Sequence, residues 1–184
     1  RLWIENVGPD LAKRALAYAE RWTMRWHEAR QHLLSSQICC LNHLLPFATE
    51  PAALARLLEP IFGSDLEMLP ITGDGLPGEP WYVAFEYFGP PGSDFLSEGA
   101  GRALTRGANC TSVDAVVRFR RAGRTELVLI EWKYTERYGD RMPEQADLVR
   151  ERRYRPLMEG AGGVLRSDVS IPFHRLLVEP VYQM

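Results

Sequence analysis

Two apolar segments decide how this chain folds: NCTSVDAVVRF at residues 109–119 and, after a turn, ELVLIEWKY at residues 126–134. Both segments are rich in β-branched, aromatic and aliphatic side chains, which favour extended strands. The residues Arg-Ala-Gly-Arg at positions 121–124 lie between them. Two such runs separated by a short turn containing glycine predict a β-hairpin.

The register of this hairpin follows from its tip. If Ala122 and Gly123 form the turn, residues whose numbers sum to 245 face each other. Asp114 then lies opposite Glu131, and opposed residues point to the same side with Cβ atoms about 5 Å apart. By the same count Ser112 lies opposite Lys133. The other side forms an apolar core face, made of Val113, Ala115, Val117 and Phe119 against Val128, Ile130 and Trp132.

Two opposed carboxylates with a lysine beside them call for neutralisation, because like charges facing each other on a sheet are unfavourable. Either one carboxylate takes up a proton, or a cation lies between them. Hard divalent cations such as Mg²⁺ prefer oxygen ligands of this kind. In the simpler alternative, Lys133 together with Arg118 or another arginine neutralises Asp114 and Glu131 as an ion-pair cluster. Geometry alone leaves both interpretations open.

Asp114, followed one strand later by Glu131-Trp132-Lys133, resembles the D…(D/E)xK signature of the PD-(D/E)xK, or restriction-endonuclease-like, nuclease superfamily. Val113 stands where the "PD" pair has proline. The likeness to one bacterial restriction-endonuclease-like branch runs from about Ser35 to the C-terminus. It is carried by Ser35-Ser36-Gln37 with Asn42, by residues 106–115 and by residues 130–136.

This resemblance implies an α/β fold with a restriction-endonuclease-like core, in which helices flank a central mixed sheet. Residues 1–34 are expected to form a helical segment packed on the core, and residues 35–184 the nuclease domain. The segment 81–88 is predicted to be the first core strand. Residues 179–184 resemble the start of the helix that precedes a fourth core strand, so we expect the core to continue beyond Met184.

The resemblance further implies a nuclease that hydrolyses phosphodiester bonds, with DNA favoured as the substrate. Asp114 and Glu131 would hold Mg²⁺ or Mn²⁺, and the Trp132 backbone carbonyl would be an added ligand. Lys133 would assist the attacking water. The alternative is a catalytically inactive module on the same fold that binds nucleic acid or another protein. Cleavage of both strands often requires two sites, so a homodimer is one expected oligomeric state.

Several other residues are candidates for the same site. Glu86 shares a predicted strand face with Ala84 and Phe88, so it is either a further metal ligand or a strand-edge acid that points to solvent. Gln37 is polar within an apolar segment, where it either contacts substrate or forms a buried hydrogen bond. The candidate contacts to nucleic acid are Arg106, Ser112, Arg118 and Gln37.

Net charge is −2, but the charge is unevenly distributed. Residues 101–155 carry thirteen Lys or Arg against eight Asp or Glu, and the rest of the chain carries nine against sixteen. The positive charge therefore surrounds the carboxylate hairpin, where a phosphate backbone would lie; the alternative is an arginine-rich solvated surface. The apolar runs are all short, so we expect no membrane span, and we expect no signal peptide. Its odd number of cysteines suits a reducing compartment such as the cytoplasm.

Helices are predicted at four places. Apolar residues recur at helical spacing from Asp10 to about Leu34. Ser35 or Ser36 can cap a second helix that runs through Leu45. A third is expected to start at Thr49 or Pro51 and to run through Leu58. Residues 143–153 favour a fourth. On the second helix Cys39 or Cys40 could share a face with His43, but buried small side chains are the better interpretation than a zinc site.

Overall fold

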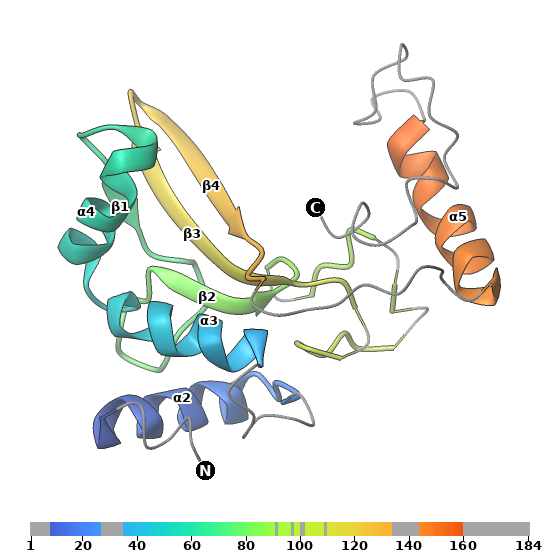
Figure 1. The fold of residues 1–184 in the computed structure, drawn as a ribbon, viewed down its shortest axis with the longest axis horizontal. Coiled ribbons are helices and arrows are strands. Elements are labelled where there is room, and N and C mark those ends of the chain that lie inside the picture. The colour runs from blue at the N-terminus through green and yellow to red at the C-terminus, as the bar shows by residue number, and fades with distance from the viewer. Residues whose placement is uncertain are drawn as a thin grey trace. The chain divides into compact units, whose positions relative to one another are not determined.

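A computed structural model of the protein describes residues 8–26, 35–90, 92–96, 98–99, 102–108, 110–133 and 144–159. The chain separates into two compact units, residues 1–135 and 136–184. The helices of the first unit are α2 (Pro9–Arg21), α3 (Ser36–Leu44), the 3₁₀ helix η1 (Leu45–Phe47) and α4 (Pro51–Phe62). Its strands are β1 (Glu67–Leu69), β2 (Val83–Tyr87), β3 (Val113–Arg121) and β4 (Arg124–Ile130). In the second unit the described residues form α5 (Glu144–Glu159). The predicted α/β class is confirmed (Figure 1).

Strand β3 is the centre of the sheet. Strand β4 pairs along one edge of β3, while β2 and β1 share the other edge, opposite residues 113–117 and 118–120 respectively. All three pairings are antiparallel. The mixed sheet expected from the resemblance therefore has no parallel pair among the described strands. Strand β1 was not predicted, because a three-residue strand carries too little periodicity to be recognised.

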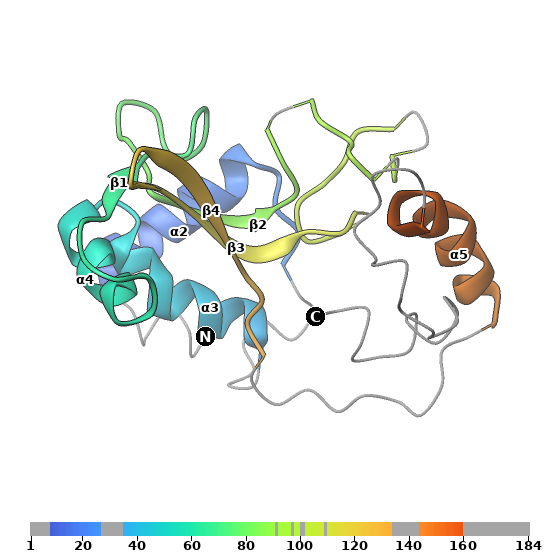
Figure 2. The same ribbon diagram turned by 90° about the horizontal axis from the view of Figure 1, so that it is seen from above.

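The register predicted for the hairpin is confirmed. Ala115 lies opposite Ile130 and Arg121 opposite Arg124, so the numbers of facing residues sum to 245. The tip consists of Ala122 and Gly123, with φ angles of 48° and 76°. Positive φ at both central residues is the type I′ conformation, whose twist matches that of paired strands. Figure 2 shows β3 and β4 running together from this turn.

One hydrophobic core joins the sheet to the helices of the first unit. Val83 and Phe85 of β2 and Ala115, Val117 and Phe119 of β3 supply the sheet side. The helical side includes Ala15 and Tyr18 of α2, Ile38 and Leu41 of α3, and Leu54 and Leu58 of α4. Period-2 alternation on the strands and helical spacing on the helices bring these residues to a common interior.

Helix α2 is shorter than predicted. It ends at Arg21, and Thr23 adopts a left-handed φ of 49°. The Thr23 N–H donates to the Glu20 carbonyl at 3.1 Å and the Met24 N–H to the Ala19 carbonyl at 2.8 Å. This pair of bonds is the Schellman motif, which terminates a helix. The prediction for residues 27–34 lies outside the described residues.

The other helices start where expected. Ser35 caps α3, with its hydroxyl oxygen accepting from the Ile38 N–H at 3.4 Å. Helix α4 begins at Pro51 but continues one turn past Leu58, with Pro60 inside it. Among the described residues, no helix is both long and apolar enough to cross a membrane. The predictions for residues 179–184 lie outside the described part of the chain.

Candidate active site

Strand β2 changes its alternation at Glu86. Val83 and Phe85 face the helix-side core, while Ala84 packs in a second buried cluster. Regular alternation would place Glu86 with Ala84. Instead Glu86 has a left-handed φ of 47°, and its carboxylate bonds to Gln37 of α3. The local backbone conformation therefore turns this acid toward α3.

The Glu86 carboxylate is held at both oxygens. The Gln37 side-chain amide donates to Oε1 at 2.8 Å, and the Ser112 hydroxyl donates to Oε2 at 3.0 Å. The residue is only 6% exposed, so the interpretation of Glu86 as a solvent-facing acid is wrong. Two residues predicted to contact nucleic acid, Gln37 and Ser112, instead bond a buried carboxylate here.

Gly107 closes the same cluster. It has a φ of +70°, and a Cβ atom at this position would lie 2.6 Å from the Arg25 carbonyl oxygen and 3.2 Å from Gln37 Nε2. Gln37 also donates to that Arg25 carbonyl at 3.2 Å. Only glycine fits so close to another backbone with this φ. The exit of α2, the start of α3 and the segment before β3 therefore meet at Glu86.

The start of β3 follows the distortion of β2. Val113, predicted to share a face with Ala115, packs instead with Ile71, Ala84 and Val116 in the second buried cluster. Val113 pairs with Tyr87, the residue after left-handed Glu86, which explains the shift. The other residues of the predicted core face do belong to the helix-side core, namely Ala115, Val117, Phe119, Val128, Ile130 and Trp132.

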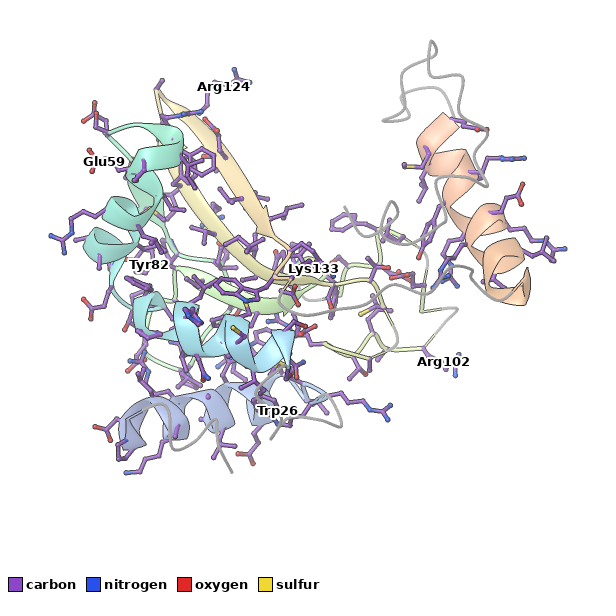
Figure 3. All side chains as sticks on the ribbon, viewed as in Figure 1. Trp26, Glu59, Tyr82, Arg102, Arg124 and Lys133 are labelled. Atoms are coloured by element: carbon purple, nitrogen blue, oxygen red, sulfur yellow. The ribbon has the colours of Figure 1, made fainter. Side chains whose placement is uncertain are left out.

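The acids predicted to be catalytic lie at the open end of the hairpin. The last regular pair of β3 and β4 is Ala115 with Ile130. Beyond it, Asp114 Oδ2 accepts a hydrogen bond from the Trp132 backbone N–H at 2.6 Å. Lys133 Nζ lies 2.6 Å from Glu131 Oε1. Figure 3 shows Lys133 just past the end of β4.

Asp114 is the most perturbed acid of this group. Its pKa is raised to about 6, mainly by burial, and the nearby acids Glu131 and Glu86 contribute to the increase. The hydrogen bond from the Trp132 N–H and the charge of Lys133 lower the pKa in part. Cys40 of α3 lies beside the same acids. Burial raises the pKa of its thiol well above the usual range, and Asp114, Glu86 and Glu131 add to the shift. The negative charge of three acids therefore converges on one end of the hairpin.

The donor set suits a hard cation. Asp114 Oδ1 accepts no hydrogen bond from the described residues. This oxygen belongs to a carboxyl group with a raised pKa and is open to a ligand. Carboxylate and carbonyl oxygens are the donors preferred by Mg²⁺ and Mn²⁺. Within the described segments, no three His, Cys, Asp or Glu side chains come close enough together to hold one ion. The side-chain donors at hand are therefore Asp114 and Glu131, beside the backbone carbonyl of Trp132.

Arg106 points into the protein rather than toward a nucleic acid. Its side chain is 2% exposed, with Nη2 at 2.6 Å from Asp74 Oδ2. Nη1 donates to the Phe85 carbonyl at 3.0 Å and to the Tyr18 hydroxyl. The guanidinium also lies 3.9 Å from the centroid of the Trp22 ring. Its position does not support the predicted contact, because a buried and paired arginine presents no charge to a phosphate.

Arg118 is likewise engaged within the protein. Its guanidinium donates to the Pro70 carbonyl and, at 3.2 Å, to the Thr72 hydroxyl. It therefore ties the segment after β1 to β3.

Sequence reasoning missed Asp74 and Tyr18, the partners of Arg106. Nothing in the sequence around Asp74 marks it as buried. Helical spacing left open whether Cys39 or Cys40 shares a face with His43. In the structure Cys39 does, with its Sγ atom 3.7 Å from Nδ1 of His43. The His43 ring also packs against Trp132, with centroids 5.2 Å apart.

Comparison with known proteins identifies the family of this chain. A model of the family described as Restriction Endonuclease associating with ARP matches residues 1–184. No curated protein matches the chain. No solved structure matches it either. The family match confirms the resemblance to restriction-endonuclease-like proteins.

Proposed function

Because this chain belongs to the family Restriction Endonuclease associating with ARP, we propose that it is a Mg²⁺- or Mn²⁺-dependent nuclease that hydrolyses phosphodiester bonds of DNA. Membership of this family indicates a nuclease-like role and interaction with nucleic acid. The observation that carries the proposal is the convergence of Asp114, Glu131 and Lys133 at the open end of the β3–β4 hairpin. The family description also names ARP, and we propose that the chain acts together with that component.

Asp114 and Glu131, with the Trp132 carbonyl, are the residues that would hold the divalent ion. A bound Mg²⁺ or Mn²⁺ would stabilise negative charge on the phosphate and make water a better nucleophile. The chain itself orients the first ligand, because the Trp132 N–H holds one oxygen of Asp114 in place. Because the pKa of Asp114 is about 6, binding of a divalent ion below that pH would require Asp114 to release its proton.

Lys133 supplies the positive charge beside these acids. Its ammonium is 2.6 Å from Glu131, on the residue directly after Trp132. From this position we assign it to orient the attacking water by hydrogen bonding and to stabilise charge that develops on the phosphate oxygens. Loss of this ammonium should therefore affect the chemical step more than ion binding.

The test is cleavage of supercoiled plasmid with Mg²⁺, Mn²⁺ or EDTA, using the chain and its Lys133→Met variant. The matched control is Lys13→Met, since Lys13 is the only other lysine and forms an exposed pair with Asp10. We expect wild type and Lys13→Met to nick plasmid only with the divalent ion, and Lys133→Met not to nick it.

Thermal melting with Mn²⁺ gives a second readout that does not depend on cleavage. Mn²⁺ should raise the melting temperature of wild type and Lys133→Met, but not of Asp114→Ala. Normal cutting by Lys133→Met would overturn the role assigned to this lysine. A wild type that neither cuts nor responds to Mn²⁺ would overturn the metal-nuclease proposal and favour the inactive module.

A further inference from the structure

The segment between β2 and β3 exposes an aromatic ring. Phe95 is 70% exposed, and it is the only aromatic residue among the exposed large hydrophobic residues of the described part of the chain. Arg102, on the same segment, is also exposed. No described residue forms a hydrogen bond or ion pair with the Arg102 guanidinium. Figure 3 shows Arg102 at the outer side of this segment.

Hydrogen bonds join several of the described residues of this segment. The Asp94 carboxylate accepts from the backbone N–H groups of Glu98 at 2.8 Å and Gly99 at 3.0 Å. The Arg102 N–H donates to the Gly99 carbonyl at 2.8 Å. The Phe95 ring lies against Gly89, where a Cβ atom would come within 2.8 Å of the ring. Phe95 therefore has a preferred position although most of its surface faces solvent.

The same segment is bonded to the start of the strand that carries Asp114. Glu98 accepts from the Thr111 N–H at 2.5 Å and from the Thr111 hydroxyl at 2.8 Å. Thr111 directly precedes Ser112, which bonds Glu86, and lies three residues before Asp114. The segment that carries Phe95 is thus hydrogen-bonded to the residues that lead into the candidate active site.

An exposed, positioned aromatic ring together with an exposed arginine on the same segment is a combination that can bind single-stranded nucleic acid. The ring stacks on a base, whatever its identity, because every base has a π-face. The arginine neutralises a phosphate of the backbone. Asp94 and Glu98 of the segment keep their charge, but each accepts hydrogen bonds within the protein, which partly offset it. Exposed aliphatic residues such as Ile61 on α4 have no such π-face.

We propose that Phe95 stacks on an unpaired nucleobase of the nucleic acid bound at the candidate active site, while Arg102 contacts a phosphate of the same strand. This inference rests on the proposed function, since it assigns the substrate contact of the same site. It adds that the protein engages a single-stranded or locally unpaired segment.

The test is binding of a single-stranded oligonucleotide that contains 2-aminopurine, measured with EDTA present so that no cleavage occurs. Stacking on Phe95 should quench the fluorescence of the probe. Because stacking of one base on an aromatic ring contributes about 1–3 kcal/mol, Phe95→Ala should weaken binding roughly 5- to 150-fold and abolish the quenching. Phe95→Trp should retain both. Arg102→Ala should weaken binding and reduce its salt dependence, but keep the quenching.

Ile61→Ala is the matched control, because Ile61 is 74% exposed and lies on α4. It should bind and quench as wild type does. Equal affinity and quenching by wild type and Phe95→Ala would overturn the inference. If the wild type still nicks plasmid with Mg²⁺ in that case, the nuclease proposal stands without the stacking role of Phe95. Failure of wild type both to bind the probe and to nick plasmid would overturn both.

Discussion

The side-chain amide of Gln37 donates a hydrogen bond of 2.8 Å to the carboxylate of Glu86, and the two residues lie 49 positions apart on α3 and β2. Both are buried, at 2% and 6% exposure. Glu86, which accepts this bond, has a left-handed backbone conformation, and that conformation is costly for a residue other than glycine. Strain of this kind persists only where surrounding contacts enforce it. The pair therefore fixes how α3 approaches the end of β2 beside Asp114.

Removing the Gln37 donor should destabilise the protein. In Gln37→Leu the buried Glu86 carboxylate loses one of its two side-chain donors, which should lower the free energy of unfolding by about 1–3 kcal/mol. Urea unfolding measures the change. Asn42→Leu is the matched control on α3, because the Asn42 side chain forms no hydrogen bond with the described residues, and it should change little. The loss in Gln37→Leu should shrink when Glu86→Gln is added. An undiminished loss would contradict a role for the buried charge.

Asp114 should make the metal-free protein less stable as pH rises. Its pKa is about 6 in the folded protein, against 3.8 for an ordinary aspartate. Between these values the folded protein holds a proton that the unfolded chain has released, so the free energy of unfolding falls with rising pH. The loss develops as pH rises through about 6. One pKa unit corresponds to about 1.4 kcal/mol, but solvent screening of this half-buried group keeps the loss below about 3 kcal/mol.

Asp114→Asn isolates this contribution, since the amide oxygen can still accept from the Trp132 N–H. In EDTA the variant should be more stable than wild type at pH 7 and nearly equal to it at pH 4. Urea unfolding at the two pH values provides the comparison. If the variant and the wild type differ in free energy of unfolding by the same amount at both pH values, Asp114 does not titrate as described.

The buried ion pair of Arg106 and Asp74 should matter far more than an exposed one. Arg106→Met leaves the Asp74 carboxylate buried without its cation, which should cost about 3–5 kcal/mol. Arg120 and Glu67 form a comparable pair at 2.8 Å, but both side chains are about half exposed. Arg120→Met should therefore cost no more than about 1 kcal/mol. Chemical unfolding of the two variants tests the contrast. A stable Arg106→Met variant that binds nucleic acid weakly would instead support the contact predicted from the sequence.

The tip of the hairpin should accept asparagine better than alanine. Ala122 has a φ of 48°, which is costly for alanine and tolerated by asparagine. Ala122→Asn creates an Asn-Gly turn and should raise the free energy of unfolding by about 0.5–1 kcal/mol, the order of other conformational substitutions in turns. Ala122→Val should lower it, because a β-branched side chain resists positive φ. Thermal unfolding distinguishes the two. Stabilisation by valine would contradict the type I′ geometry.

The hairpin was predictable because its information is local. Strand composition and the Ala122–Gly123 tip set the pairing of residues that are close in the chain, and a single register satisfies the core face. Capping by Ser35 and the proline start of α4 are also local preferences, which the structure bears out. These features need only a few neighbouring residues to be recognised.

The predictions that the structure does not support depend on contacts between residues far apart in the chain. Arg106 was predicted to contact nucleic acid at the surface, since arginine is usually exposed. In the structure it is buried and paired with Asp74, 32 positions away. Val113 left its expected face because Glu86 distorts the strand beside it. No local pattern marks either event.

Local pattern alone therefore sets the β3–β4 hairpin, its register and the placement of Asp114, Glu131 and Lys133 at its open end, since each depends on residues within one turn and two strands. Folding of the whole first unit adds what surrounds them: Glu86 turned toward Gln37, Ser112 bonded to that acid, and Arg106 buried against Asp74. Those contacts join segments 26 to 49 residues apart. They form only when the helices pack on the sheet and burial makes each unpaired polar group costly.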